Sequence, residues 1–343
     1  MRYKLLGKSG LRVSELALGT MTFGTDWGWG APEEVCRQAF DVYAEAGGNF
    51  IDTANRYTNG TAETFVAEFI AADRDHFVLS TKYTLFDRRD DPNFSGNQRK
   101  NMVRSLEASL KRLQTDYVDL FYVHAWDFMT PVEEVMRALD DLVRAGKVLY
   151  VGISDTPAWV VAQANTLADL RGWSRFVGLQ TRYSLVDRAA ERDLLPMARA
   201  LDIGVTAWSV LGAGVLTGKY NREETAEDGR AARWDLAERD LAIAGEVVKV
   251  AEDIGRSPSQ VALNWVRQQP GVMIPLIGAT KVSQLEDNLA CVEFELTWAQ
   301  LQRLDEASRI DLGFPHNFLA SDEIRDLVYG GTYGRVDNHR AGL

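Results

Sequence analysis

Residues 118–155, VDLFYVHAWDFMTPVEEVMRALDDLVRAGKVLYVGISD, contain two apolar runs separated by an amphipathic segment. The runs at 118–125 and 148–155 are almost continuously apolar, which is typical of parallel strands covered on both faces. Residues with capping preferences mark a helix between them: Thr130 as N-cap, Pro131 in the first turn, Glu133 in a capping box and Gly146 at the end. This stretch therefore predicts a strand–helix–strand unit of a parallel sheet.

The same pattern recurs on both sides of this unit. Eight apolar runs alternate with amphipathic stretches, and we expect each run to form a strand: 15–21, 49–54, 77–83, 118–125, 148–155, 176–183, 203–211 and 272–279. A second helix start of the same kind is expected at Ser257, Pro258 and Gln260. Because no linker rich in Pro, Gly or Ser interrupts the alternation, the sequence predicts an α/β fold, a (β/α)8 TIM barrel forming a single domain over residues 1–343.

The barrel is expected to span about residues 14–310, with an additional segment at each end. Residues 1–13 carry two short apolar runs around the turn-forming cluster Gly7-Lys8-Ser9-Gly10, which predicts a hairpin that caps the barrel floor. Residues 311–343 show no alternation of strand and helix. We expect them to form a C-terminal tail that wraps the outside or one mouth of the barrel.

Composition and charge narrow the possible functions. The 343 residues are 46% hydrophobic with a formal net charge of −11, so we expect a folded core and no binding of nucleic acids or anionic membranes. The nearest approach to a basic patch is Arg88-Arg89, which acids flank in FDRRDD. Cys36 and Cys291 lack metal-ligand spacing, which predicts buried thiols and no metal site. With no signal-peptide pattern and no long apolar run, a cytoplasmic protein is expected.

Polar residues stand at the C-terminal ends of the expected strands, where barrel enzymes place their active sites. They are Asp52, Lys82, His124, Ser154, Asp155, Gln180, Trp208 and Ser209. Singly, an aspartate at a strand end is often a cap, and a lone histidine is often only hydrogen-bonded. Asp, Lys and His on three neighbouring strand ends, with Tyr57 just beyond the first, instead predict a reactive site.

These four residues indicate proton transfer. The carboxylate of Asp52 is expected to keep the buried amine of Lys82 charged, and that ammonium stabilises a phenolate, so the pair should tune the pKa of Tyr57. With His124 within hydrogen-bonding reach, Tyr57 is then able to give a proton to a substrate. A protonated amine argues against the alternative of a barrel aldolase or isomerase that uses Lys82 as a Schiff base.

Five motifs resemble those of the aldo-keto reductases: FIDTANRY at 50–57, STKY at 80–83, FYVHAWD at 121–127, GISD at 152–155 and WSVLGAGVLTGKY at 208–220. LIGATKVSQLEDNLA at 276–290 is similar to the segment that holds the adenosine phosphate in this family. The resemblance covers residues 1–310 and favours the longer-chain, aryl-alcohol dehydrogenase-like branches. It implies a tetrad in which Tyr57 protonates a carbonyl oxygen while NAD(P)H delivers hydride: Asp52, Tyr57, Lys82 and His124.

The resemblance also implies how the dinucleotide is held. The implied contacts are Trp208 on the nicotinamide, Ser154, Asp155 and Gln180 at its carboxamide, and the loop Ser209 to Lys219, with Leu211 and Gly212, at the pyrophosphate. Further implied contacts are Gly19, Thr20, Gly278, Thr280, Lys281, Gln284, Asp287 and Asn288. Two positions depart from the family pattern, since Asp155 stands where many members have Asn and Val210 where a proline often follows. A core position is the alternative for Trp208.

Other nicotinamide-binding folds do not fit the sequence. GAGVLTG at 212–218 has the wrong glycine spacing for G-x-G-x-x-G and follows the seventh strand instead of the first. The chain contains no Tyr-x-x-x-Lys pair, which weighs against a short-chain dehydrogenase. NADP(H) is expected over NAD(H) because Lys281 is available for a 2′-phosphate, with Arg230 and Arg233 as further candidates or as solvated surface charges.

The substrate is expected to be a small carbonyl compound or alcohol. Trp27, Trp29 and Trp126 should rim the pocket, which favours flat or apolar carbonyl compounds, although packing on the barrel rim is the alternative. The expected function is the reversible, NADPH-dependent reduction of an aldehyde or ketone to an alcohol. A cofactor-sensing regulatory subunit with the same fold and little turnover is the alternative. The sequence leaves the oligomeric state open.

Overall fold

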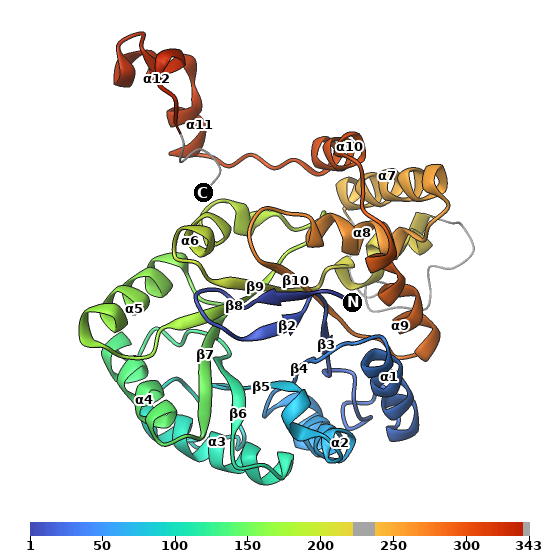
Figure 1. Ribbon diagram of the computed structural model, residues 1–343, viewed down its shortest axis with the longest axis vertical. Helices are drawn as coiled ribbons and strands as arrows, with labels where there is room; N and C mark the ends of the chain where they lie inside the picture. The colour runs from blue at the N-terminus through green and yellow to red at the C-terminus, as the bar shows by residue number, and fades with distance from the viewer. Residues whose placement is uncertain (222–236, 339–343) are drawn as a thin grey trace.

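A computed structural model describes residues 1–221 and 237–338. Its centre is a closed barrel of parallel strands, β10-β3-β4-β5-β6-β7-β8-β9, which confirms the predicted fold (Figure 1). The barrel strands lie inside the eight predicted runs: β3 Ala17–Gly19, β4 Phe50–Asp52, β5 Val78–Tyr83, β6 Val118–Val123, β7 Val148–Ser154, β8 Phe176–Arg182, β9 Gly204–Trp208 and β10 Met273–Ile277. The ring closes where Leu276 and Ile277 pair with Ala17 and Leu18.

Helices surround this barrel (Figure 1). Those between and after its strands are α1 Glu33–Glu45, α2 Thr61–Ile70, α3 Arg99–Leu113, α4 Val132–Arg144, α5 Ala158–Arg171, α6 Leu194–Ala200, α7 Glu238–Ile254, α8 Pro258–Arg267, α9 Val282–Leu289 and α10 Trp298–Ser308. A large apolar cluster fills the layer between strands and helices. None of the helices in the described residues combines the length and apolarity needed to cross a membrane.

The N-terminal hairpin closes the barrel floor, as predicted. Its strands β1 Tyr3–Leu5 and β2 Arg12–Ser14 pair antiparallel. Leu6 and Val13 are fully buried in a second apolar cluster with residues from the beginnings of the barrel strands, such as Phe50 and Ile274. The barrel therefore opens to ligands at its other end, where the strands finish.

A tyrosine fills the barrel interior above this floor. Tyr122 is fully buried, and its hydroxyl lies 3.1 Å from that of Thr206 across the barrel. A Cβ atom at Gly152 on the neighbouring strand would lie 2.4 Å from the Tyr122 ring. Glycine is therefore required at position 152 to leave room for the ring.

The two predicted helix starts behave differently. Ser257 caps α8 as predicted, since its hydroxyl accepts the Gln260 N–H at 3.2 Å. The Gln260 side chain donates to Asp287 in α9 at 2.8 Å instead of completing a capping box. The predicted cap at Thr130 is wrong, because Pro131 is the N-cap of α4 and the Thr130 hydroxyl donates to Asp127 at 2.8 Å.

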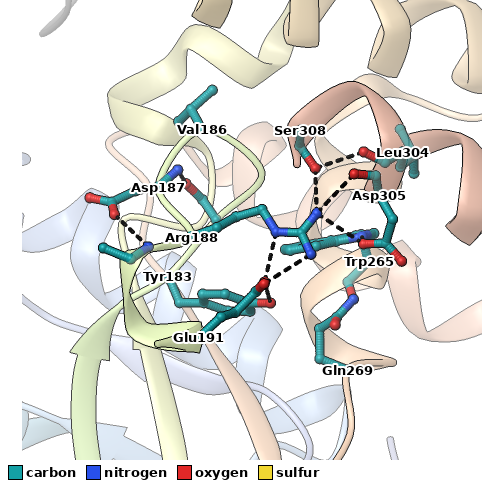
Figure 2. A network of polar contacts seen from close by, with 12 residues as sticks. Tyr183, Val186, Asp187, Arg188, Glu191, Trp265, Gln269, Leu304, Asp305 and Ser308 are labelled. Atoms are coloured by element: carbon teal, nitrogen blue, oxygen red, sulfur yellow. Dashed lines mark hydrogen bonds and ion pairs between the residues drawn. The ribbon is translucent and has the colours of Figure 1, made fainter. Parts of the chain in front are cut away.

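Arg188 ties the loop after β8 to α8 and α10 (Figure 2). Its guanidinium donates to Glu191 at 2.7 and 3.1 Å and to the Ser308 hydroxyl at 2.8 Å, and it lies 5.0 Å from the ring centroid of Trp265. The Asp305 carboxylate forms an ion pair with this guanidinium and accepts from the Trp265 indole, both at 3.1 Å. One cation thus joins three segments that are distant in the sequence.

The C-terminal tail does not wrap the barrel as expected. Beyond α10 the chain extends away from the helix ring and forms α11 His316–Ala320 and α12 Asp322–Tyr329 (Figure 1). Arg192 holds the start of this tail by donating to the backbone oxygen of Asp311 at 2.9 Å. Within the described residues, the hydrogen bonds of residues 312–337 join them to one another or to Asp311. Local bonding therefore replaces contact with the barrel.

Candidate active site

A cavity of about 520 Å³ opens at the C-terminal ends of the barrel strands. Most of the residues singled out in the sequence lie on its wall: Gly19, Tyr57, His124, Ser154, Asp155, Gln180, Trp208, Ser209, Leu211, Gly278 and Asn288. Asp52 and Lys82 are fully buried beneath them. The strand ends thus bring together residues from positions 19 to 288.

The centre of the site is an ion pair beneath a phenol. Lys82 Nζ donates to Asp52 Oδ2 at 2.7 Å, to the Thr53 backbone oxygen at 2.8 Å and to Tyr57 Oη at 3.1 Å. Ser80 and Gln180 donate to the other carboxylate oxygen of Asp52 at 3.0 and 2.9 Å. Every donor of the ammonium has an acceptor, which fixes the Tyr57 oxygen at the cavity wall.

The pKa of Lys82 follows from these contacts. Burial lowers the pKa of Lys82. The charge of Asp52 and the contact with Tyr57 raise it by a larger amount, so the pKa lies above the ordinary 10.5. Lys82 is therefore an ammonium at neutral pH. This protonation argues against a Schiff base at Lys82, as the sequence predicted.

Burial dominates the pKa of Tyr57. Loss of solvent raises it and the ammonium of Lys82 lowers it, and the net result lies above the ordinary value of 10.0. The effect of Lys82 has the predicted sign, and burial of the phenol opposes it with a larger effect. Tyr57 is thus a protonated donor throughout the neutral range.

His124 stands beside this phenol. The two rings meet edge to face with centroids 5.9 Å apart. Burial and the nearby charge of Lys82 hold the pKa of His124 well below 6.5, so the imidazole is neutral. Its buried Nδ1 has no hydrogen-bond partner in the described structure. A neutral imidazole carries one donor and one acceptor nitrogen.

The groups expected at the nicotinamide carboxamide already have partners. The Asp155 carboxylate accepts from the Trp208 indole at 3.2 Å, and Gln180 donates to Asp52. Burial raises the pKa of Asp155 despite this bond. Ser154 is buried at the end of β7, beside them. Trp208 and Asp155 therefore hold each other in place at the cavity wall.

The loop after β9 has an irregular backbone next to the cavity. Ser209, Gly212 and Gly214 have φ of 58°, 55° and 97°. A Cβ at Gly212 would lie 2.7 Å from the Val186 side chain, so glycine is required there. Lys219 follows, with its Nζ 4.8 Å from the Tyr220 ring centroid. Ser209, Leu211 and Ala213 of this loop line the cavity, whereas Gly212 and Lys219 do not. The loop's backbone amides and one cation are a composition suited to phosphate oxygens.

Helix α9 begins four residues after Gly278, which lines the cavity, whereas Thr280, Lys281 and Gln284 do not line it. Lys281 is its N-cap residue and is exposed, and Gln284 accepts from the Thr280 N–H at 3.2 Å. Asp287 does not line the cavity, because it accepts from Ser257 and Gln260 at 2.8 Å and so joins α9 to α8. The predicted residues Arg230 and Arg233 lie outside the described part of the chain.

The remaining predicted contacts divide between wall and framework. Trp27 and Trp29 line the cavity, with ring centroids 5.5 Å apart. Trp126 lies outside the lining and packs, partly buried, on the core. Thr20 also lies outside it, and its hydroxyl donates to the Asp52 backbone oxygen at 3.0 Å.

Several wall residues were not singled out in the sequence. They are Met21, Thr22, Arg56, Leu85, Ala213, Leu263, Leu276 and Ile277. Arg56 had a signal, since it directly precedes Tyr57. Leu263 had none, because it lies on α8, whose apolar face looks the same whether or not it reaches a cavity.

The wall fits a dinucleotide. Gly19 and Gly278 lie at the ends of the neighbouring strands β3 and β10, where they leave the wall open, and a Cβ at Gly278 would lie 3.2 Å from the Gly19 oxygen. The indole of Trp208, at the end of β9, offers a flat surface on the cavity wall. The described residues contain no group of three or more side chains suited to a metal ion.

Comparison with known proteins places the chain in one family. A model of the aldo/keto reductase family matches residues 15–309. Norsolorinic acid reductase A of Aspergillus parasiticus is 40% identical over 330 residues, covering 92% of this chain and 84% of that protein. An aryl-alcohol dehydrogenase (NADP(+)) of Phanerodontia chrysosporium is 37% identical, with 93% and 89% covered. An aryl-alcohol dehydrogenase of Pestalotiopsis microspora is also 37% identical, with 93% and 85% covered.

The family match, the closed barrel and the Asp-Lys-Tyr arrangement at its mouth agree with one another. The chain belongs to the aldo/keto reductase family and is an NAD(P)H-dependent oxidoreductase that acts on carbonyl compounds.

Proposed function

We propose that this protein reduces an aldehyde or ketone to an alcohol with NADPH, reversibly, and that Tyr57 is the proton donor. The observation that carries the proposal is Tyr57, which lines the cavity and whose oxygen lies 3.1 Å from the buried ammonium of Lys82. The nicotinamide, when bound, supplies hydride to the carbonyl carbon. The side chains at the barrel mouth supply the proton and position the carbonyl oxygen.

Tyr57 and His124 are proposed to hold the carbonyl oxygen. As negative charge develops on that oxygen, the phenol proton moves to it, and the ammonium of Lys82 stabilises the phenolate left behind. Asp52 keeps Lys82 charged and in position at 2.7 Å. The raised pKa of Tyr57 suits this direction, because the proton is retained until the substrate oxygen becomes basic.

Three regions are proposed to hold the dinucleotide. Trp208 would contact the nicotinamide, with Ser154, Asp155 and Gln180 close to its carboxamide. The loop from Ser209 to Lys219 would take the pyrophosphate. The start of α9 would take the adenosine end, where the helix N-terminus and Lys281 both favour an anion.

Two observations support NADPH over NADH. A similar protein from Phanerodontia chrysosporium carries NADP(+) in its name. Lys281 is exposed at the N-terminus of α9, where a 2′-phosphate would add two negative charges. The paired indoles of Trp27 and Trp29 favour a flat, aromatic carbonyl substrate, in line with relatives named aryl-alcohol dehydrogenase.

A screen of aromatic and aliphatic aldehydes, followed by NADPH absorbance, tests the proposal. We expect multiple turnovers with aromatic aldehydes and a higher kcat/KM for NADPH than for NADH. Cofactor binding without turnover of any carbonyl compound would instead favour a regulatory subunit that senses the cofactor. The complete set of Asp52, Tyr57, Lys82 and His124 at one cavity favours the enzyme.

A further inference from the structure

A second cavity lies beside the active site. Its volume is about 400 Å³, and its walls come from the turn after β4, the loop after β5 and one face of α3. Four arginines line it: Arg56, Arg89, Arg104 and Arg112. Asp87 is the only carboxylate among the described residues of this wall. Such a cluster is unexpected in a chain with a net charge of −11, and the sequence showed only Arg88-Arg89 flanked by acids.

Helix α3 presents two of these arginines on one side. Arg104, Ala108 and Arg112 are spaced four residues apart, so they share a helix face that spans about 12 Å. The small Ala108 side chain leaves space between the two guanidinium groups. Arg104 donates to Asp87 at 2.7 Å, and Arg112 donates to the buried Glu63 at 2.6 Å. These bonds use only part of the five donors that each guanidinium carries.

The other two arginines have no carboxylate partner. Arg56 and Arg89 lie with their guanidinium carbons 4.5 and 4.6 Å from the ring centroid of Phe86. Neither forms an ion pair within the described residues. Asp87 does not balance them, because its carboxylate already pairs with Arg104 at 2.7 Å. The cavity therefore holds two positive charges that no ion pair balances.

Buried polar atoms add to this excess of donors. Arg104 Nε is buried without an acceptor in the described structure. Asn55 is 3% exposed, and its amide donates to Ser105 as well as to Asp87, so it holds the carboxylate on one side of the cavity. The wall thus carries more donors than acceptors, with the Asn55 Oδ1 as one acceptor that is buried without a hydrogen-bond partner in the described structure.

We propose that this arginine pocket is an anion-binding subsite that takes the phosphate or carboxylate group of a small molecule. Planar guanidinium groups bind both oxyanions through paired hydrogen bonds. Arg56 lines both cavities and directly precedes Tyr57, so a bound anion lies next to the carbonyl site. The anion is either the charged end of a carbonyl substrate, which rests on the proposed function, or a free anion that acts on the enzyme.

Titration calorimetry with inorganic phosphate tests the subsite. Saturating NADP⁺ fills the cofactor site, and the ionic strength is held constant. We expect Arg89→Gln to weaken phosphate binding about 10-fold, because it removes one of the two unbalanced charges. Arg89 is exposed and forms no ion pair, so this variant is expected to fold.

Arg88→Gln is the matched control. Arg88 is the adjacent arginine and is also exposed, but it lies 4.1 Å from the Phe94 ring centroid, pairs with Asp91 at 3.5 Å and does not line the pocket. The Arg88→Gln variant should bind phosphate with the same affinity as the wild type. No measurable phosphate binding, or an equal loss in both variants, would overturn the subsite.

Kinetics then identify the source of the anion. An aromatic aldehyde with a flexible chain ending in a carboxylate is compared with its methyl ester. The subsite is assigned to the substrate if the wild type has a higher kcat/KM for the carboxylate than for the ester, and if Arg89→Gln abolishes this difference without changing the value for the ester. Phosphate inhibition of both aldehydes in the wild type, but not in Arg89→Gln, assigns it to a free anion. Phosphate binding without reduction of either aldehyde supports the subsite and refutes the proposed reductase activity.

Discussion

At the scale of single residues, the oxygen atom of Tyr57 carries the proposed chemistry. Tyr57→Phe removes the proton donor and leaves the cavity shape almost unchanged, so turnover should fall on the order of 10²- to 10⁴-fold. Cofactor affinity, measured by fluorescence titration, should stay the same. Tyr83→Phe is the control, because its phenol donates to the Asn97 backbone oxygen at 3.1 Å, outside the cavity lining. Near-native turnover in Tyr57→Phe would refute the role of the phenol.

The protonation states of the site predict a flat pH profile. The pKa values of Tyr57 and Lys82 lie above 10.0 and 10.5, and that of His124 lies well below 6.5. None of the three changes charge in the free enzyme between about pH 7 and pH 9, so kcat/KM for reduction should stay constant there. A descending limb within this window would show that Tyr57 or His124 titrates inside it.

Sequence reasoning located these residues but not their energetics. Asp52, Lys82 and His124 each end an apolar run, and the position of a strand end is a local property. The net pKa of Tyr57 depends on how much solvent the closed barrel excludes, which no local pattern encodes. The bond from Gln180 to Asp52, 128 positions apart, was missed for the same reason.

At the scale of elements, the start of α9 is proposed to select the dinucleotide. Lys281→Ala should lower the preference for NADPH over NADH by about 10- to 100-fold, the value of one charged hydrogen bond. The measurement is kcat/KM with both cofactors. Lys281→Arg, which keeps the charge, should retain the preference. If Lys281→Ala kept the wild-type preference for NADPH over NADH, the proposed contact between Lys281 and the 2′-phosphate would be wrong.

The Arg188 network in Figure 2 is expected to stabilise the contact between α8, α10 and the loop after β8. Arg188→Met leaves Glu191 and Asp305 without their shared cation, so unfolding in urea should require about 2–3 kcal/mol less. Arg192→Met, an exposed neighbour, should change the free energy of unfolding by less than about 0.5 kcal/mol. Equal effects would mean that the network adds no stability.

Features of the helices could be predicted where they depend only on residues close together in the sequence. The Ser257 cap was predicted because it needs only residues three positions apart. The Thr130 cap was wrong because α4 begins one residue later than predicted, with Pro131 as its N-cap, and the Thr130 side chain bonds to Asp127 instead. Asp287 was assigned to the cofactor by resemblance, whereas its carboxylate joins two helices.

At the scale of the whole molecule, the tail contributes little to the barrel. Removing residues 313–343 should change the melting temperature by no more than about 2 °C and leave kcat/KM unchanged, because the hydrogen bonds of the described tail residues are local. Differential scanning calorimetry and the aldehyde assay measure both. A large loss of activity would place the tail at the active site.

The barrel was predictable from repetition, because eight similar runs leave few alternatives. The arginine pocket was not predictable, since its charges come from positions 56, 89, 104 and 112 and meet only when β4, β5 and α3 are packed. The course of the tail was not predictable either. Its segments form helices without a neighbour, and sequence periodicity does not reveal what a helix packs against.

The closed barrel floor imposes an order on events in time. With the hairpin filling one end, the groups proposed for nicotinamide and for carbonyl compound share one cavity and one mouth. We expect a carbonyl compound seated at Tyr57 to obstruct the route to Trp208, so that the dinucleotide arrives first and departs last. Double-reciprocal plots of initial rates should give intersecting lines. The oxidised dinucleotide should inhibit competitively against the reduced dinucleotide only, and the alcohol should not inhibit competitively against either substrate.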